Sequence, residues 1–186
     1  MLTDTAVSFG VAEHAETRYV IAAAKAHVPT VRRSTGGSGL LHGPGDLAWS
    51  VVLPRDDPRV GTDYVRAYGR LGEGVVRFLA ERGVAAAWVD PPGSFPEYCL
   101  LSARGSVLAA GEKVLGGAAQ HLSATALLHH GIVPREIRRP VLEEVFRMPE
   151  REAKRLTSLR ELGIEDPPEQ LAWKLAARLA DSLGPS

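Results

Sequence analysis

Residues 32–54 read RRSTGGSGLLHGPGDLAWSVVLP, and this stretch decides the fold. Its glycine-dense part, Ser34–Asp46, lies between two segments that read as strands. The glycines within Gly36–Gly39 permit backbone conformations closed to other residues and allow a ligand to approach main-chain amides. The two preceding arginines add fixed donors for a phosphate or a carboxylate. The pattern therefore predicts a ligand-binding bend, although the glycines alone fit a flexible hairpin equally well.

Hydrophobic periodicity predicts the elements on either side of this bend. Apolar runs bounded by turn residues predict strands over Thr5–Val11, Val28–Arg33, Leu47–Leu53 and Val84–Asp90, and short strands through Glu97–Val133, which begins with EYCLLS. Three- and four-residue spacing predicts helices over Glu16–Ala26, Gly61–Arg82, Arg138–Met148, Glu150–Leu162 and Glu169–Leu183. Asp166 predicts an acid cap for the last helix. The order of the elements predicts an α+β fold, with a mixed β-sheet flanked by helices.

The amino-acid composition of the chain limits the classes of function that it could have. The 186 residues are 24% charged and 45% apolar, and their formal charges cancel, which is typical of one globular domain over residues 1–186. Neutrality gives no general field for nucleic acid or an anionic membrane. The single cysteine cannot form an internal disulfide, and the sequence starts without a signal pattern or any apolar run long enough to span a bilayer. These features predict a cytoplasmic protein with neither a nucleic-acid nor a membrane partner.

Four blocks carry a resemblance to a known family. They are residues 32–54, GEKVLGGAAQ at 111–120, ALLHHGIV at 126–133 and TSLRELG at 157–163. In this order they resemble the lipoate-protein ligase A and octanoyltransferase family. The resemblance implies the catalytic-domain fold shared with biotin protein ligases. It also implies an enzyme that moves an octanoyl or lipoyl group to a lysine of a carrier domain, such as glycine cleavage H protein or a dehydrogenase E2.

Three versions of that function stay open. The first is acyl transfer through a cysteine thioester with lysine assistance, with acyl carrier protein as a possible donor. The second is an ATP-dependent lipoate-protein ligase that forms an acyl-adenylate and uses Mg with ATP. The third is a homologue that binds an acyl group or a carrier without catalysis. None of them implies a permanently bound cofactor, and the six histidines form no metal-like cluster.

Lys113 and Cys99 are the candidate catalytic residues. By resemblance, Lys113 holds the acyl carbonyl or the adenylate phosphate, and it is expected to be buried beside the glycine bend in one cavity. An ordinary surface lysine is the alternative. Cys99 lies one expected turn upstream and is interpreted as the nucleophile, with Lys113 as the cation that favours its thiolate. The alternative for Cys99 is a small buried hydrophobic residue.

The other candidate site residues come from the glycine-rich block, the lysine block and the His-Gly block. His42 is expected to shape the bend, His129 or His130 to line the site, and Trp49 to belong to the core or to an acyl tunnel. The cluster Arg135–Arg139 is a solvated charge run or a face for an acidic carrier. The predicted substrate- or adenylate-binding residues are Arg32, Arg33, Ser34, Thr35, Gly36, Gly37, Ser38, Gly39, His42, Gly116, Gly117, Ala118, His130 and Gly131.

The sequence also departs from the family pattern. The family's usual first strand and helix are absent before Ala6, Ser38 stands where ligases have glycine, and the Lys113–Gln120 spacing is one residue longer than usual. A C-terminal accessory domain is also absent. The missing accessory domain and the single cysteine favour a transferase over a two-domain ligase, and the missing first strand and helix favour neither. Their absence also predicts a sheet edge that could pair in a homodimer or with a completing partner chain.

Overall fold

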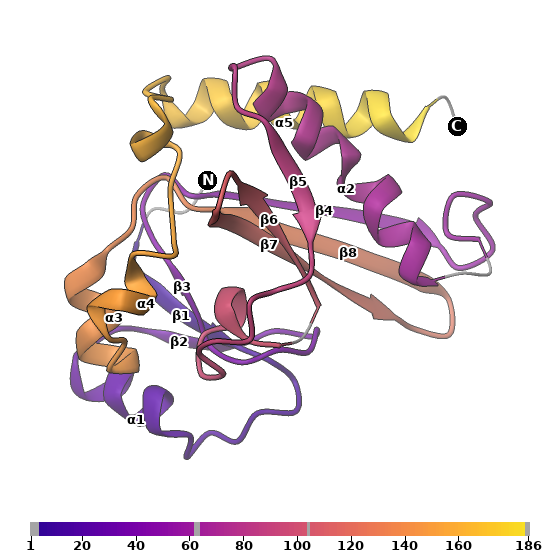
Figure 1. Cartoon of the computed structure of the whole chain (residues 1–186). Coiled ribbons are helices and arrows are strands. Elements are labelled where there is room, and N and C mark those ends of the chain that lie inside the picture. The colour runs from indigo at the N-terminus through magenta and orange to yellow at the C-terminus, as the bar shows by residue number, and fades with distance from the viewer. Residues whose placement is uncertain (1–3, 62–63, 104, 185–186) are drawn as a thin grey trace.

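A computed structural model describes residues 4–61, 64–103 and 105–184. Two sheets and a set of helices make up the α+β architecture that the order of elements predicts (Figure 1). The smaller sheet contains β1 (Ala6–Phe9), β2 (Thr30–Arg32) and β3 (Leu40–His42), in the order β2-β1-β3. β1 pairs with β2 in parallel and with β3 antiparallel, so this sheet is mixed.

The larger sheet is antiparallel and has the order β4-β8-β7-β6-β5. Its strands are β4 (Leu47–Pro54), β5 (Ala86–Val89), β6 (Ser106–Ala110), β7 (Lys113–Leu122) and β8 (Ala126–Val133). Side chains along β4 alternate strictly between buried and exposed, because successive residues of a strand point to opposite faces. One face of β4 is therefore packed in the core, and the other, with Ala48, Ser50, Val52 and Pro54, is exposed.

Helices α2 (Tyr64–Ala80) and α5 (Pro168–Leu183) cover one face of the larger sheet (Figure 1). The buried stripe of α2 contains Leu71, Val75, Phe78 and Leu79, as its spacing predicts. Gly83, with φ of 74°, follows α2 and confirms the predicted stop. Residues 62 and 63 of the predicted helix, and the Tyr64 side chain, lie outside the described residues.

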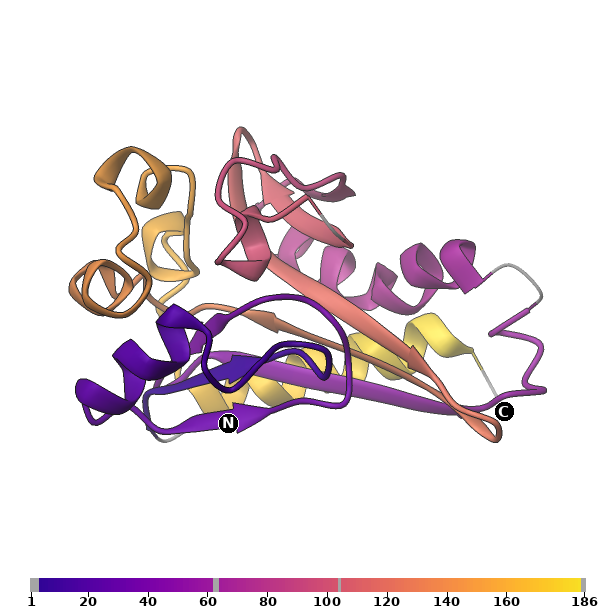
Figure 2. The same ribbon diagram turned by 90° about the horizontal axis from the view of Figure 1, so that it is seen from below.

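Helix α1 (Arg18–Lys25) lies near α3 (Arg139–Phe146), α4 (Glu150–Ala153) and the smaller sheet (Figure 2). Tyr19 of α1 stacks on Phe146 of α3, with ring centroids 5.3 Å apart, and Tyr98 meets the same ring edge-on at 5.1 Å. This aromatic cluster is the centre of a second core. It supports the end of the glycine-rich bend, because Gly39 packs directly against Tyr19 and Phe146.

Local structure differs from the sequence expectations at four places. EYCLLS contains a short 3₁₀ turn, η1 (Cys99–Leu101), instead of a strand. Glu150–Leu162 is broken into α4 and a second 3₁₀ turn, η2 (Arg160–Leu162), and β3 forms inside the glycine-dense stretch. Asp166 does not cap α5. The N-cap is Pro167, which has no side-chain cap bond, and Asp166 instead accepts a 3.3 Å hydrogen bond from Lys174.

Candidate active site

A cleft of about 280 Å³ opens between the smaller sheet and one face of the larger sheet. That volume is close to the lower end of the ~300–1,000 Å³ typical of small-molecule sites. Much of its lining is apolar, and the larger sheet contributes small residues, among them Gly117, Ala118 and Ala119. The apolar lining includes Ala6, Leu40, Leu100, Val107, Ala119 and Ile132.

Polar side chains form one wall of this cleft: Ser8, Arg33, His42, Cys99 and His130. They come from five separate elements or loops, and the glycine-rich bend joins them. Gly37 adopts φ of 95°, a conformation that L-residues with a side chain rarely take. A Cβ on Gly37 would lie 2.8 Å from both Arg33 Nη2 and Cys99 Sγ. Glycine is therefore required here both for the conformation and for the close approach.

The Arg33 guanidinium organises the bend. Its Nη2 donates to the carbonyl oxygens of Gly36 and Ser38, each at 2.9 Å, and its Nη1 donates to Ser8 Oγ at 3.0 Å. The same Nη2 lies 3.7 Å from Cys99 Sγ. One cation thus fixes the loop and stands beside the only thiol of the chain.

Cys99 reaches the bend because the backbone holds it there. Its amide donates to the Gly39 carbonyl at 2.8 Å, and Gly39 donates to the Glu97 carbonyl at 3.2 Å. Sγ accepts a hydrogen bond from the Ser38 amide. Burial raises the pKa of the Cys99 thiol above its ordinary value, while Arg33 and the Ser38 amide act in the opposite direction. The thiol therefore lies beside groups that stabilise its thiolate, within a desolvated setting.

His42 and Ser8 extend this polar wall. His42 Nε2 lies 2.7 Å from Ser8 Oγ, which also accepts from Arg33, so the imidazole accepts the serine proton. Burial, then Arg33 and His130, lower the pKa of His42 to about 4. His42 is therefore neutral at physiological pH, and it is linked to the glycine-rich bend through Ser8 and Arg33. Ser8 was not singled out by sequence, because a serine inside an apolar strand carries no local signal.

His130, and not His129, lines the cleft. Its Nε2 lies 2.8 Å from the buried Thr35 Oγ1, which ties β8 to the glycine-rich bend. Burial and Arg33 lower the pKa of His130. His129 points to the opposite face of the sheet, where its fully buried ring contacts Trp49 and Tyr68 at centroid distances of 4.9 Å. Trp49 belongs to that core and also borders the cleft.

Lys113 is not buried in the cleft, and the expectation that it closes one cavity with the glycine bend is wrong for this structure. It begins β7 after the Gly111–Glu112 turn, its side chain is exposed, and it does not line the cleft. Lys113 and Gly117 are four positions apart, a span of about 13 Å along a strand. The cation beside Cys99 is Arg33 instead.

Arg32 also departs from its expected place. Its guanidinium donates to the carbonyl oxygens of Val11 and Glu13 and lies 4.6 Å above the Phe9 ring, outside the cleft. Arg32 and Arg33 are adjacent at the end of a strand, so their side chains point to opposite faces. Only Arg33 faces the site.

The remaining predicted residues divide into two groups. Thr35, Gly36, Gly37, Ser38 and Gly39 form the bend, and Gly117, Ala118 and Gly131 line the cleft. Ser34 is exposed, and Gly116 lies where strands approach closely, since a Cβ there would meet the Ile132 carbonyl oxygen at 2.3 Å. Gly116 therefore has a packing reason to be glycine.

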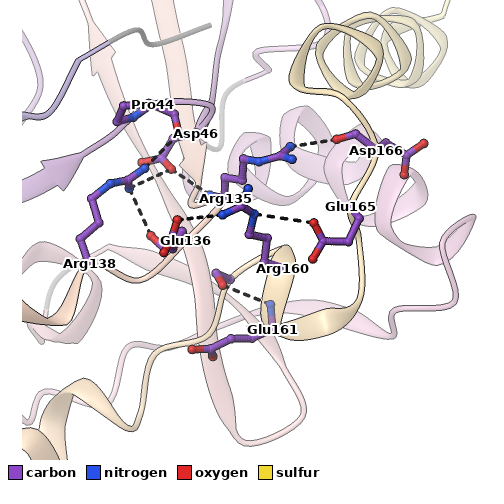
Figure 3. Close-up of polar contacts among 10 residues, drawn as sticks. Pro44, Asp46, Arg135, Glu136, Arg138, Arg160, Glu161, Glu165 and Asp166 are labelled. Atoms are coloured by element: carbon purple, nitrogen blue, oxygen red, sulfur yellow. Dashed lines mark hydrogen bonds and ion pairs between the residues drawn. The ribbon is translucent and has the colours of Figure 1, made fainter.

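Arg135 and Arg138 belong to a network of ion pairs and hydrogen bonds (Figure 3). Arg138 pairs with the buried Asp46 at 3.4 Å, and Arg135 donates to the Asp166 carbonyl at 2.8 Å. Neighbouring pairs join Arg160 to Glu136 and Arg139 to Glu161. These arginines therefore lie in pairs with groups of the same chain instead of forming a run of unpaired charges.

Among the residues that the structure describes, no group of three or more His, Cys, Asp or Glu side chains is placed to hold a metal ion. None of the helices in the described ranges has the length and apolar content needed to cross a membrane.

Comparisons with known proteins agree with this geometry. The chain is 33% identical to the octanoyltransferase LipM of an Exiguobacterium species over 152 residues, which are 75% of this chain and 55% of that protein. It is 32% identical to LipM of Symbiobacterium thermophilum over 128 residues, 64% and 46% of the two chains. The chain thus spans about half the length of the curated relatives that it matches.

Solved structures share the fold. A lipoate-protein ligase A bound with ATP superimposes with a TM-score of 0.78 at 24% identity, covering 97% of this chain and 69% of that one. The bi-partite lipoate protein ligase of Thermoplasma acidophilum gives 0.74 at 24% identity, covering 97% and 68%. The family model described as the lipoyl protein ligase A/B catalytic domain matches residues 3–179. The chain therefore belongs to the lipoyl protein ligase A/B catalytic domain family.

Proposed function

We propose that this protein transfers a medium-chain acyl group, octanoyl in the first instance, to a lysine of a lipoyl carrier domain through a thioester on Cys99. The observation that carries the proposal is the position of Cys99 Sγ at the polar wall of an apolar cleft, 3.7 Å from Arg33 Nη2. The similarity to octanoyltransferases supports the same chemistry.

The first half-reaction loads the enzyme. An acyl thioester, such as that of acyl carrier protein, places its chain against Leu40, Leu100 and Ile132 in the cleft. Cys99 Sγ attacks the carbonyl carbon, so a new C–S bond forms as the donor C–S bond breaks. The donor thiolate leaves and takes up the proton that Cys99 has lost. Arg33 stabilises the attacking thiolate, and the Ser38 amide adds a second donor.

The second half-reaction passes the group on. The neutral amine of a carrier lysine attacks the Cys99 thioester, a C–N bond forms, the C–S bond breaks, and Cys99 regains a proton. His42 and His130 are neutral at physiological pH because burial lowers the pKa of each. Arg33 then remains the cation of the cleft wall for both steps.

An assay that omits ATP separates this route from a ligase. Octanoyl-acyl carrier protein and a lipoyl domain are incubated with the enzyme, and octanoylated lipoyl domain is measured by mass spectrometry. Wild type should transfer without ATP, and Cys99→Ser should abolish transfer. If transfer instead needs free acid and ATP and survives Cys99→Ser, the acyl-adenylate route is established. If no donor supports turnover, the protein is a binding homologue.

A matched pair of arginine variants tests the role of the cation. Arg33→Met removes the guanidinium beside Cys99, so transfer should fall steeply and its pH dependence should move to higher pH. Arg32→Met removes the same charge one residue away but outside the cleft, and should keep the wild-type pH profile.

Lys113 keeps its predicted catalytic role only if its side chain moves toward the cleft. Loss of transfer in Lys113→Ala with Cys99 acylation intact would assign it to the second half-reaction.

A further inference from the structure

A second groove, of about 400 Å³, runs along the outer edge of β4. β4 is the edge strand of the larger sheet, and its outer side pairs with no strand in the part of the chain that the structure describes. The opposite wall of the groove is α5, through Ala172, Leu175, Ala176, Leu179, Ala180 and Leu183. Figure 2 shows β4 along the outside of the sheet with α5 beside it.

The chemistry of this groove suits a polypeptide strand better than an acyl chain. The α5 wall is apolar, and a hydrocarbon chain could cover it. The other wall is a strand edge whose outward amide and carbonyl groups need hydrogen-bond partners, and an acyl chain has none to offer. An extended strand satisfies both walls, because its backbone pairs with β4 and alternate side chains reach α5.

β4 lacks most of the features that usually protect an edge. Its first seven residues, Leu47–Leu53, contain no charged residue, no proline and no bulge in their pairing with β8, and Pro54 comes at its end. Beside it, α5 exposes the small side chains of Ala176 and Ala180, and the Trp173 ring one turn earlier is 78% exposed. On β4 itself, Val52 is 64% exposed. Val52, Ala176 and Ala180 line the groove, and Val52 lies on the face of β4 that points away from α5.

The sequence of β4 is complementary to itself. When two copies pair antiparallel about a two-fold axis at Ser50, Leu47 of one copy lies opposite Leu53 of the other, and Trp49 lies opposite Val51. On the other face of the sheet, Ala48 lies opposite Val52 and Ser50 lies opposite its own copy. Every one of these pairs keeps buried positions on one face and exposed positions on the other.

We propose that the β4 edge and α5 form a homodimer interface, in which two copies join their larger sheets through antiparallel β4 strands centred on Ser50. The two-fold axis is perpendicular to the sheet, so both copies of α5 lie on the same face. Their alanine stripes, which include Ala176 and Ala180, face each other across the seam. The pairing is independent of Cys99 chemistry.

A cross-linking experiment tests the register. In a Cys99→Ser background, Ser50→Cys places a thiol on the two-fold axis, opposite its own copy and at the short Cβ separation of directly opposed residues. Mild oxidation should give a disulfide-linked dimer on a non-reducing gel. Val89→Cys, on the opposite edge strand β5, is the matched control and should stay monomeric on the gel. Linkage of Val89→Cys without linkage of Ser50→Cys would overturn the proposal.

The oligomeric state gives an independent test. Light scattering across a concentration series should report a dimer for wild type. Ser50→Lys sets two like charges opposite each other and should give a monomer with an unchanged circular dichroism spectrum, whereas Val89→Lys should stay dimeric. A wild-type monomer at all concentrations would overturn the proposal and leave the edge to a different polypeptide. So would a Ser50→Lys variant that is folded and still dimeric.

Discussion

The Arg33 guanidinium connects three parts of the site that are distant in the sequence. It donates hydrogen bonds to two carbonyl groups of the glycine-rich bend and to the Ser8 hydroxyl of β1. It also lies 3.7 Å from Cys99 Sγ. Gly37 makes this arrangement possible, since its missing side chain leaves room for both the guanidinium and the thiol. The site therefore depends on one cation and on one position without a Cβ.

Two neighbouring glycines give a matched test of that dependence. Gly37→Ala places a methyl group 2.8 Å from Arg33 Nη2 and from Cys99 Sγ and strains a positive φ by about 1–2 kcal/mol. Acylation of Cys99 should slow by roughly tenfold or more. Gly36→Ala meets nothing within 4 Å and should acylate at the wild-type rate. Stopped-flow or quenched mass spectrometry measures both rates, and equal rates would contradict the close-approach argument.

Residue types predicted the site better than residue orientations did. The glycine bend and His42 could be predicted as one group because their block pattern is local, whereas Cys99 was expected beside Lys113 and lies beside Arg33 instead. Arg32 and Arg33 look equivalent in sequence, and only the period of two along a strand separates them. Lys113 was expected in the cavity by resemblance. The two-residue turn before it sets where β7 begins, and its side chain is exposed there.

At the scale of elements, α2 and α5 cross where their backbones approach each other closely at Gly74. A Cβ on Gly74 of α2 would lie 2.6 Å from the Arg178 carbonyl oxygen and 2.7 Å from Leu179 Cα, both on the α5 backbone. The two helices thus contact each other backbone to backbone above the larger sheet. Gly69 belongs to the same helix but has open space around it.

Alanine at these two positions should change stability in opposite directions. Gly69→Ala should raise the free energy of unfolding by about 1 kcal/mol, because alanine favours the helix. Gly74→Ala gains the same propensity, but it forces the helices apart at a typical cost of about 1–3 kcal/mol and should lower the melting temperature. Urea titration measures both. Equal stabilisation of the two variants would show that the helices can separate without cost.

Elements with long, regular patterns could be predicted, and elements set by tertiary contacts could not. β4 and α5 match their periodicity almost to the residue. The EYCLLS segment has the composition of a strand, yet it forms a 3₁₀ turn because the Cys99 amide bonds to the Gly39 carbonyl. That bond joins segments 60 residues apart. No local pattern contains it, and it is the bond that brings the thiol to the bend.

For the whole molecule, acid stability follows from a buried histidine. Both ring nitrogens of His129 lack a hydrogen-bond partner among the described residues, and the ring is fully buried beneath α2. Burial, with a smaller contribution from His130, lowers the pKa of His129 to about 3. In the unfolded chain it titrates near 6.5, so the unfolded state binds more protons between about pH 3 and 6.5. Stability should therefore fall with decreasing pH across that window and level off below it.

Replacing His129 should remove much of that loss. Between pH 6.5 and pH 5, a histidine that stays neutral in the fold lowers the free energy of unfolding by about 2 kcal/mol. His129→Leu should be less sensitive to acid than wild type, although His42 still contributes. His121→Leu, at an exposed position of β7, is the control and should follow wild type. Denaturant titrations at several pH values measure this, and a wild-type pH slope in His129→Leu would contradict the assignment.

The central claim is that Cys99 carries the acyl group during transfer, and one measurement tests it most directly. The protein is incubated with octanoyl-acyl carrier protein, quenched in acid and digested, and the peptides are mapped by mass spectrometry. The account predicts one octanoyl group on the peptide that contains Cys99, removed when a lipoyl domain is added before quenching. An octanoyl group on any other residue, or transfer to the lipoyl domain while Cys99 is never acylated, would contradict it.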